Sequence, residues 1–242
     1  MKRCKILLTN DDGITGKGLR PLLKELRKFS SAVAVVPQSE ASASSHALSL
    51  HQALRLIEIE RGVYAVNGTP ADCVRLGIIS LMRGRADLVV SGINQGPNLA
   101  EDVIYSGTVA GAREACMMGI AGLAVSLAHG SRFGEASILA ARAVRKILAM
   151  KVPQGVFFNL NLTVPSKGIK ITGLGKRIYG RDVTARKDPR GKTYYWIAGE
   201  KLGGEDIRGT DYSAVKRGYS SLTPLNYNHT EYGFMGKLNE HF

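Results

Sequence analysis

The sequence has few cysteines and no apolar run long enough to cross a membrane. No stretch of the 242 residues reaches the roughly 20 apolar residues that a membrane-spanning helix needs. The basic start is followed by only a short apolar segment, so we expect no signal peptide. The cysteines are an odd number, lie far apart and fall in apolar segments: Cys4, Cys73 and Cys116. They are predicted to be reduced core thiols of a cytoplasmic protein.

Acidic residues are also scarce relative to basic ones. The formal net charge is +13 and the sequence pI is about 9.8, while 44% of the residues are hydrophobic. That composition suits a globular chain with a sizeable core. The positive charge indicates an anionic ligand or partner and leaves nucleic acid open, although a solvated basic surface is the plainer interpretation.

Short apolar runs alternate with helical patterns through the first two thirds of the chain. Residues 6–8 form the first apolar run, and Leu19, Leu22, Leu23 and Leu26 follow at helical spacing. Further apolar runs occupy 32–36, 87–91, 123–127 and 156–162. Such alternation predicts an α/β fold with a Rossmann-like, mostly parallel sheet and helices on both faces. We assign residues 1–165 to this α/β core.

Residues 166–242 differ in character and are predicted to be a C-terminal extension used for oligomerisation. Residues 176–201 read as a long hairpin with a turn at 188–191 and the aromatic run Tyr194-Tyr195-Trp196. A short helix at 211–219 and a strand at 220–225 follow. Exposed aromatic residues on a projecting hairpin are typical of an interface.

An acidic turn closes the first strand. Asp11 and Asp12 are adjacent, and ligands of open α/β sheets bind at the carboxyl ends of the strands. Hard cations such as Mg²⁺ or Mn²⁺ prefer carboxylate oxygens. The plainer interpretation is a turn in which Asn and Asp side chains bond to their own backbone.

Other predicted strand exits carry polar groups that suit the same edge. The loop at 39–45 is rich in serine, and its hydroxyls could bind a metal or phosphate. Asn94 offers a neutral oxygen ligand. Ser106-Gly107-Thr108 opens a small-residue helix, which Thr108 is predicted to cap, and a helix N-terminus attracts anions. Thr69 and Asp72 fit the start of another helix, where simple capping explains them.

These motifs resemble the SurE family, the survival-protein-E 5′-nucleotidases. The resemblance lies in Thr9–Gly13, Gly68–Val74, Ser91–Asn98, Tyr105–Val109 and the tail from Asp211 to Leu225. It implies a phosphatase that hydrolyses nucleoside 5′-monophosphates with one divalent cation, Mg²⁺ or Mn²⁺. The base, the 3′ position, polyphosphate as a further substrate and the physiological metal stay open.

The resemblance also implies site residues and an assembly. The family's metal ligands correspond to Asp11, Asp12, Ser42 and Asn94. Asp11 and Asp12 are the catalytic candidates, and either an activated water or an aspartate is the nucleophile. Expected substrate or phosphate contacts are Asn10, Asn98, Ser106, Gly107 and Thr108. A homodimer or homotetramer with exchanged C-terminal elements is implied. Ala41, Ala43 and Asn228 depart from the residues usual in the family.

Other classes fit less well. A receiver domain needs an aspartate where Asn94 stands, and a haloacid-dehalogenase-type phosphatase needs Asp-x-Asp rather than adjacent carboxylates. A dinucleotide oxidoreductase needs G-x-G-x-x-G in its first turn, which the glycines at 13, 16 and 18 do not match. A non-enzymatic, basic nucleic-acid-binding protein is the main alternative, supported by charge but by no binding motif.

Overall fold

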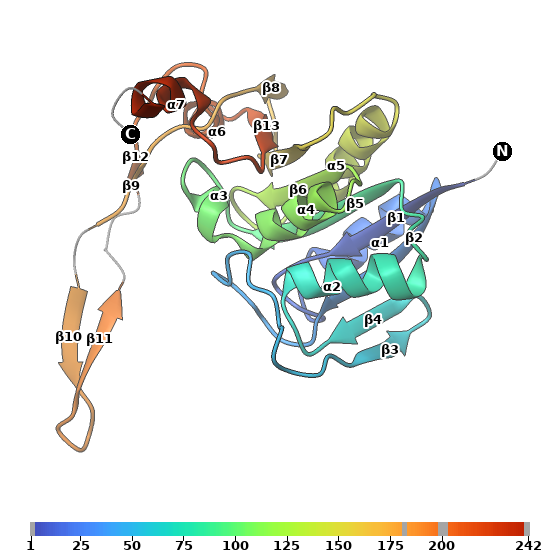
Figure 1. The fold of residues 1–242 in the computed structure, drawn as a ribbon, viewed down its shortest axis with the longest axis horizontal. Coiled ribbons are helices and arrows are strands. Elements are labelled where there is room, and N and C mark those ends of the chain that lie inside the picture. Colours follow the sequence, from blue (N-terminus) through green and yellow to red (C-terminus); the bar gives the residue numbers. More distant parts are fainter. Residues whose placement is uncertain (1–2, 181–182, 198–202, 240–242) are drawn as a thin grey trace.

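A nine-stranded sheet forms the centre of the computed structural model (Figure 1), which describes residues 3–180, 183–197 and 203–239. Its strand order is β3-β4-β2-β1-β5-β6-β7-β13-β8. The strands are β1 (Cys4–Thr9), β2 (Ser30–Pro37), β3 (Leu56–Glu60), β4 (Val63–Val66), β5 (Leu88–Gln95), β6 (Gly122–Leu127), β7 (Val156–Leu162), β8 (Ile169–Ile171) and β13 (Ser220–Asn226). All neighbours from β4 to β7 are parallel, whereas β3 and β13 run antiparallel to β4 and β7. The predicted mostly parallel sheet is confirmed.

Helices cover both faces of this sheet, as predicted. The helical segments are α1 (Leu19–Arg27), α2 (Pro70–Leu76), the π-helical η1 (Gly77–Leu81), α3 (Asp102–Tyr105), α4 (Gly107–Met117), α5 (Phe133–Leu148), α6 (Asp211–Lys216) and α7 (Tyr232–Asn239). Ile6 and Leu8 of β1 pack with α1 and α5, while Leu7 packs with α2, η1 and α4. Because alternate residues of a strand point to opposite faces of the sheet, the apolar run of β1 is buried on both faces.

The C-terminal segment contributes both to the sheet and to a projecting arm. Strand β13 inserts between β7 and β8, so the parts before and after residue 165 share one sheet, and their division stays a prediction. The arm pairs β9 (Arg177–Ile178) with β12 (Gly203–Gly204) and β10 (Val183–Lys187) with β11 (Thr193–Ile197), both antiparallel. Figure 1 shows β10 and β11 standing away from the body. Residues 181–182 and 198–202 of the predicted hairpin, and 240–242 of the tail, lie outside the described residues.

Some local features differ from the sequence-based expectation. Residues 48–55 form a loop, and α7 was not predicted. The three cysteines are free; Cys73 and Cys116 are buried and Cys4 is half-buried. In the part of the chain that the structure describes, the helices are all too short or too polar to span a membrane.

Candidate active site

The acidic turn after β1 is built by Asn10 rather than by the carboxylates. Buried Asn10 accepts a hydrogen bond from the Gly13 N–H (3.2 Å) and donates from Nδ2 to the Gly13 carbonyl (3.0 Å). Gly13 has φ +77°, and a Cβ there would lie 2.9 Å from the backbone of Ser39. Asn10 therefore closes the turn, which leaves Asp11 and Asp12 available for another role.

Both carboxylates lie in surroundings that disfavour their charge. Asp11 is buried, and burial raises its pKa although the hydroxyl and N–H of Thr108 donate to it. Burial, followed by the charges of Asp11 and Glu40, raises the pKa of Asp12 to about 6. A backbone hydrogen bond from Gln95, at the end of β5, opposes this shift. The hydrogen bonds from Thr108 and Gln95 thus compensate only part of the cost of charging Asp11 and Asp12.

The loop after β2, residues 38–49 (hereafter the Ser42 loop), folds over the acidic turn. The N–H of Ala41 donates to the backbone carbonyl of Asp11 (2.8 Å). Ser42 donates its hydroxyl proton to Glu40 (2.8 Å). The charge of Glu40, a third carboxylate carried by this loop, contributes to raising the pKa of both aspartates.

The exit of β5 contributes an amide. Asn94 is half-buried, and its Nδ2 donates to the carbonyl of Gly96 (2.9 Å). The oxygen of the same amide therefore faces the other side of the side chain. The backbone contact between Gln95 and Asp12 joins this exit to the acidic turn.

The N-terminus of α4 completes the arrangement. Ser106 caps the helix by accepting from the Val109 N–H (3.1 Å), so the expectation that Thr108 caps it was wrong. Thr108 instead donates to Asp11. A Cβ on Gly107 would lie 2.9 Å from the hydroxyl oxygen of Ser44 and 3.0 Å from Cβ of Asp11, so glycine permits this close approach. The positive end of α4 faces the acidic turn, where it favours negative charge.

Comparisons with known proteins identify the family. The family described as "Survival protein SurE" matches residues 6–181. The chain belongs to the SurE family. It is 47% identical to the 5′-nucleotidase SurE of Geobacter sulfurreducens, over 96% of this chain and 92% of that protein. The corresponding protein of Geobacter metallireducens is 46% identical, with 97% and 96% covered. The crystal structure of the SurE protein from Aquifex aeolicus matches with a TM-score of 0.86 and 37% identity, covering 98% of this chain and 99% of that one.

Sequence reasoning about this SurE-family site missed Glu40. It lies in a loop singled out only for its serines, and its proximity to Asp11 and Asp12 depends on the path of that loop. Ser44 was included in the loop but not given a role, and its hydroxyl is buried without a hydrogen-bond partner among the described residues. An acidic residue in the loop after the second strand was the available signal for Glu40.

Asn98, an expected substrate contact, lies inside the fold. Its backbone N–H donates to Asn161 (2.8 Å), its Nδ2 donates to Ser126 (2.9 Å), and its carbonyl accepts from Asn159 and Asn161. Its side chain is therefore engaged in holding the loop after β5 against β6 and β7. The side chain of Asn10 is likewise occupied by hydrogen bonds within the protein, in this case to Gly13 in the acidic turn.

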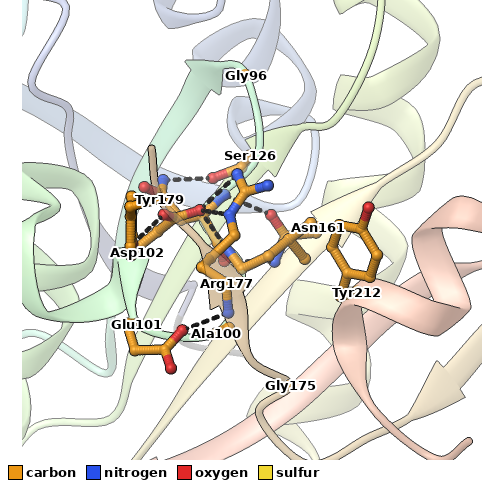
Figure 2. Close-up of polar contacts among 12 residues, drawn as sticks. Gly96, Ala100, Glu101, Asp102, Ser126, Asn161, Gly175, Arg177, Tyr179 and Tyr212 are labelled. Carbon is orange, nitrogen blue, oxygen red and sulfur yellow. Dashed lines mark hydrogen bonds and ion pairs between the residues drawn. The ribbon is translucent and has the colours of Figure 1, made fainter. Parts of the chain in front are cut away.

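The base of the arm is attached to the end of this loop (Figure 2). Asp102 accepts from Arg177 at 2.7 and 2.8 Å and from the Tyr179 hydroxyl at 2.7 Å. The backbone N–H of Arg177 donates to Glu101 (2.6 Å). Figure 2 shows the Arg177 side chain lying between Asp102 and Tyr212. The arm and the loop that follows β5 are thus parts of one connected polar network.

The donor set fits a hard divalent cation. Within the described ranges, no lysine, arginine or histidine forms an ion pair with Asp11, Asp12 or Glu40. Residues 3–180, 183–197 and 203–239 contain no group of three or more His, Cys, Asp or Glu side chains placed to hold a metal. A cation here would therefore draw on hydroxyl and amide oxygens as well, which are ligands that Mg²⁺ and Mn²⁺ accept.

Proposed function

We propose that this chain is a divalent-metal-dependent 5′-nucleotidase that hydrolyses nucleoside 5′-monophosphates to a nucleoside and phosphate. The observation that carries the proposal is the pair of adjacent carboxylates, Asp11 and Asp12, which have raised pKa values and of which Asp11 accepts from Thr108 in the first turn of α4. The names of the SurE relatives, 5′-nucleotidase, support the substrate class.

We assign the cation to Asp11, Asp12, Ser42 and Asn94. When bound, a divalent cation neutralises phosphate charge and lowers the pKa of water. Ser42 donates its proton to Glu40, so the lone pairs of its oxygen remain free to act as a ligand. Asn94 likewise uses its nitrogen on Gly96 and offers its oxygen. Mg²⁺ and Mn²⁺ are both suited to this set, since every ligand is an oxygen.

The phosphate group would lie between that cation and α4. The hydroxyl of Ser106 and the N–H groups around Gly107 supply donors at the positive end of the helix. Thr108 orients Asp11 by donating to it from both its hydroxyl and its N–H, and these hydrogen bonds oppose the rise in the Asp11 pKa that burial causes. Asn10 and Asn98 would act indirectly, by shaping the two loops that carry the ligands.

We further propose that the protein works as a homodimer or homotetramer in the cytoplasm. The arm exposes Tyr194, Tyr195, Trp196 and Ile197, with Ile197 90% accessible. Exposed apolar side chains on a projecting hairpin are typical of an interaction surface. Three free thiols suit a reducing compartment.

A phosphate-release assay tests the activity. Protein freed of metal with chelator should be inactive, and Mg²⁺ or Mn²⁺ should restore release from nucleoside 5′-monophosphates. The 3′ isomers and polyphosphate, assayed in parallel, define the substrate range. The same preparation is titrated with single- and double-stranded oligonucleotides at several salt concentrations. Salt-sensitive oligonucleotide binding without phosphate release from any nucleotide would contradict the proposal and favour a nucleic-acid-binding protein.

A further inference from the structure

A buried carboxylate lies behind the proposed active site. Glu114 belongs to α4, the helix that begins at Ser106, and its side chain is completely inaccessible. Arg75 of α2 approaches one carboxylate oxygen at 2.6 Å, and His46 Nε2 lies 2.7 Å from the other. Burial of an unpaired charge is costly, so both contacts matter to the fold around Glu114. Neither Glu114 nor His46 has a part in the proposed chemistry.

His46 belongs to the Ser42 loop, four residues after the proposed metal ligand. That loop contains no helix or strand, and most of its side chains are half-buried or exposed. Ala43 and Ser45 have φ values of +55° and +51°, which non-glycine residues rarely adopt. Since this backbone is strained, contacts with the body of the protein must hold it in place.

Contacts are present on both sides of His46. Before it, the N–H and hydroxyl of Ser45 donate to backbone carbonyls at the end of α3, at 3.0 and 2.8 Å. After it, Thr69 donates to the carbonyl of Ala47 (2.7 Å), and Asp72 accepts from the N–H of Ser49 (3.0 Å). The cap of α2, which sequence analysis explained as capping alone, thus also fastens the end of the loop.

We propose that His46 is a positioning residue: its contact with Glu114 docks the Ser42 loop so that Ser42 is held against Asp11 and Asp12. The inference rests on the proposed function for the role of Ser42. Arg75 and Glu114 join α2 to α4 without any help from His46, so removing the imidazole loosens the middle of the Ser42 loop but leaves the two helices paired. The loss then appears in cation binding rather than in the fold.

The test compares four variants with the full-length protein. His46→Ala and His46→Asn remove the contact, because the shorter asparagine does not reach Glu114. In His46→Gln, the side-chain amide nitrogen lies close to the position of Nε2, so this variant restores the contact with Glu114. His51→Ala is the control, because His51 is exposed and lies in the following loop. For each, Mn²⁺ affinity of the metal-free protein is measured by calorimetry, alongside thermal stability, kcat and KM.

Loss of one charge-assisted hydrogen bond weakens an equilibrium by about tenfold. His46→Ala and His46→Asn should therefore bind Mn²⁺ about tenfold more weakly, with a raised KM for nucleotide, while His46→Gln and His51→Ala stay near wild type. In a Ser42→Ala background, His46→Ala should cause no further loss of affinity, because its effect passes through Ser42.

Wild-type Mn²⁺ affinity in His46→Ala would overturn the inference, as would equal losses in His46→Gln and His46→Ala. A lowered melting temperature with unchanged Mn²⁺ affinity would show that the contact stabilises the fold only. The readouts separate the two proposals. If the wild type releases no phosphate but His46→Ala still weakens Mn²⁺ binding, the positioning role stands and the proposed function fails.

Discussion

The Asp12 carboxylate makes the fold less stable whenever it is ionised, because burial and the charges of Asp11 and Glu40 raise its pKa to about 6. Below the unfolded-state pKa of 3.8 the group is protonated in both states and has no effect. As the pH rises from 3.8 to about 6, the unfolded state loses its proton first, so the metal-free fold loses stability. Above about pH 6 the penalty is constant. Because Asp12 is partly exposed, the cost is on the order of 1 kcal/mol.

Asp12→Asn should therefore stabilise the metal-free protein at pH 7 and leave it nearly unchanged at pH 4, while removing most activity and weakening Mn²⁺ binding. Thermal unfolding of both proteins across this range, with chelator present, measures the difference. Asn retains the shape of the side chain, so a loss of folding would instead assign Asp12 to the turn itself. Normal Mn²⁺ affinity with lost turnover would make Asp12 a base or nucleophile rather than a ligand.

Ala43 has a φ of +55°, which is a left-handed conformation. Ala43→Gly should raise the free energy of unfolding by up to about 1 kcal/mol, since glycine adopts this conformation without steric cost. Ala41→Gly is the matched control in the same loop: it relieves no positive φ and should be neutral or destabilising. Urea denaturation measures both. Equal effects at the two positions would argue against strain at Ala43.

Elements that depend on local pattern could be predicted, whereas contacts between distant loops could not. The strand at Ile6–Leu8 and the helix cap at Thr69 could be predicted because both depend only on residues that are close in the sequence. The distance from Glu40 to Asp11 depends on how the Ser42 loop crosses the sheet edge, which no spacing encodes. The last helix, α7, is short and contains two glycines, which are weak helix formers, so its pattern was too faint to detect.

The same limit applies to candidate site residues. Adjacent Asp11 and Asp12, Asn94 and Ser106–Thr108 were found because they follow apolar runs and open helices. Whether each faces a ligand or the interior depends on tertiary packing. Asn98 illustrates this, since its partners come from β6 and β7, 28 and 63 positions away. Thr108 illustrates it too, because the group it contacts lies 97 positions earlier.

The arm is attached through one largely inaccessible ion pair, between Arg177 and Asp102, whose side chains are 10% and 16% exposed. Arg177→Met should lower the free energy of unfolding by about 2 kcal/mol, because it leaves Asp102 with an uncompensated charge. Lys176→Met is the control: its ion pair with Glu205 is exposed to solvent, so its loss should have little effect. Urea denaturation of the two variants makes the comparison. Equal effects would mean that the arm is held by backbone pairing alone.

On the scale of the whole molecule, the arm and α7 each expose several large apolar side chains, and Ile104 and Tyr105, just before Ser106, are exposed as well. Strand β11 exposes Tyr195 at 66% and Trp196 at 59%, and α7 exposes Tyr232 at 66% and Phe234 at 51%. Such surfaces are costly in water. With a formal charge of +13, monomers also repel one another, so association requires specific complementary contacts and not merely non-specific hydrophobic attraction. A second copy of this chain is the occupant we propose for the arm.

The single tryptophan of the chain is Trp196, on the arm, so intrinsic tryptophan fluorescence reports on the arm alone. If the arm packs on a second copy, dilution should convert oligomer to monomer and shift the emission towards that of solvated tryptophan. Light scattering should show the mass falling over the same concentrations.

Tyr195→Lys should favour the monomer, because it places a charge in the interface. Met150→Lys, at another exposed apolar position beyond α5, should not. A monomer at micromolar concentration with solvated Trp196 emission would contradict the proposed assembly. An oligomer whose Trp196 emission stays solvated would place the interface elsewhere, with α7 as the next surface to test.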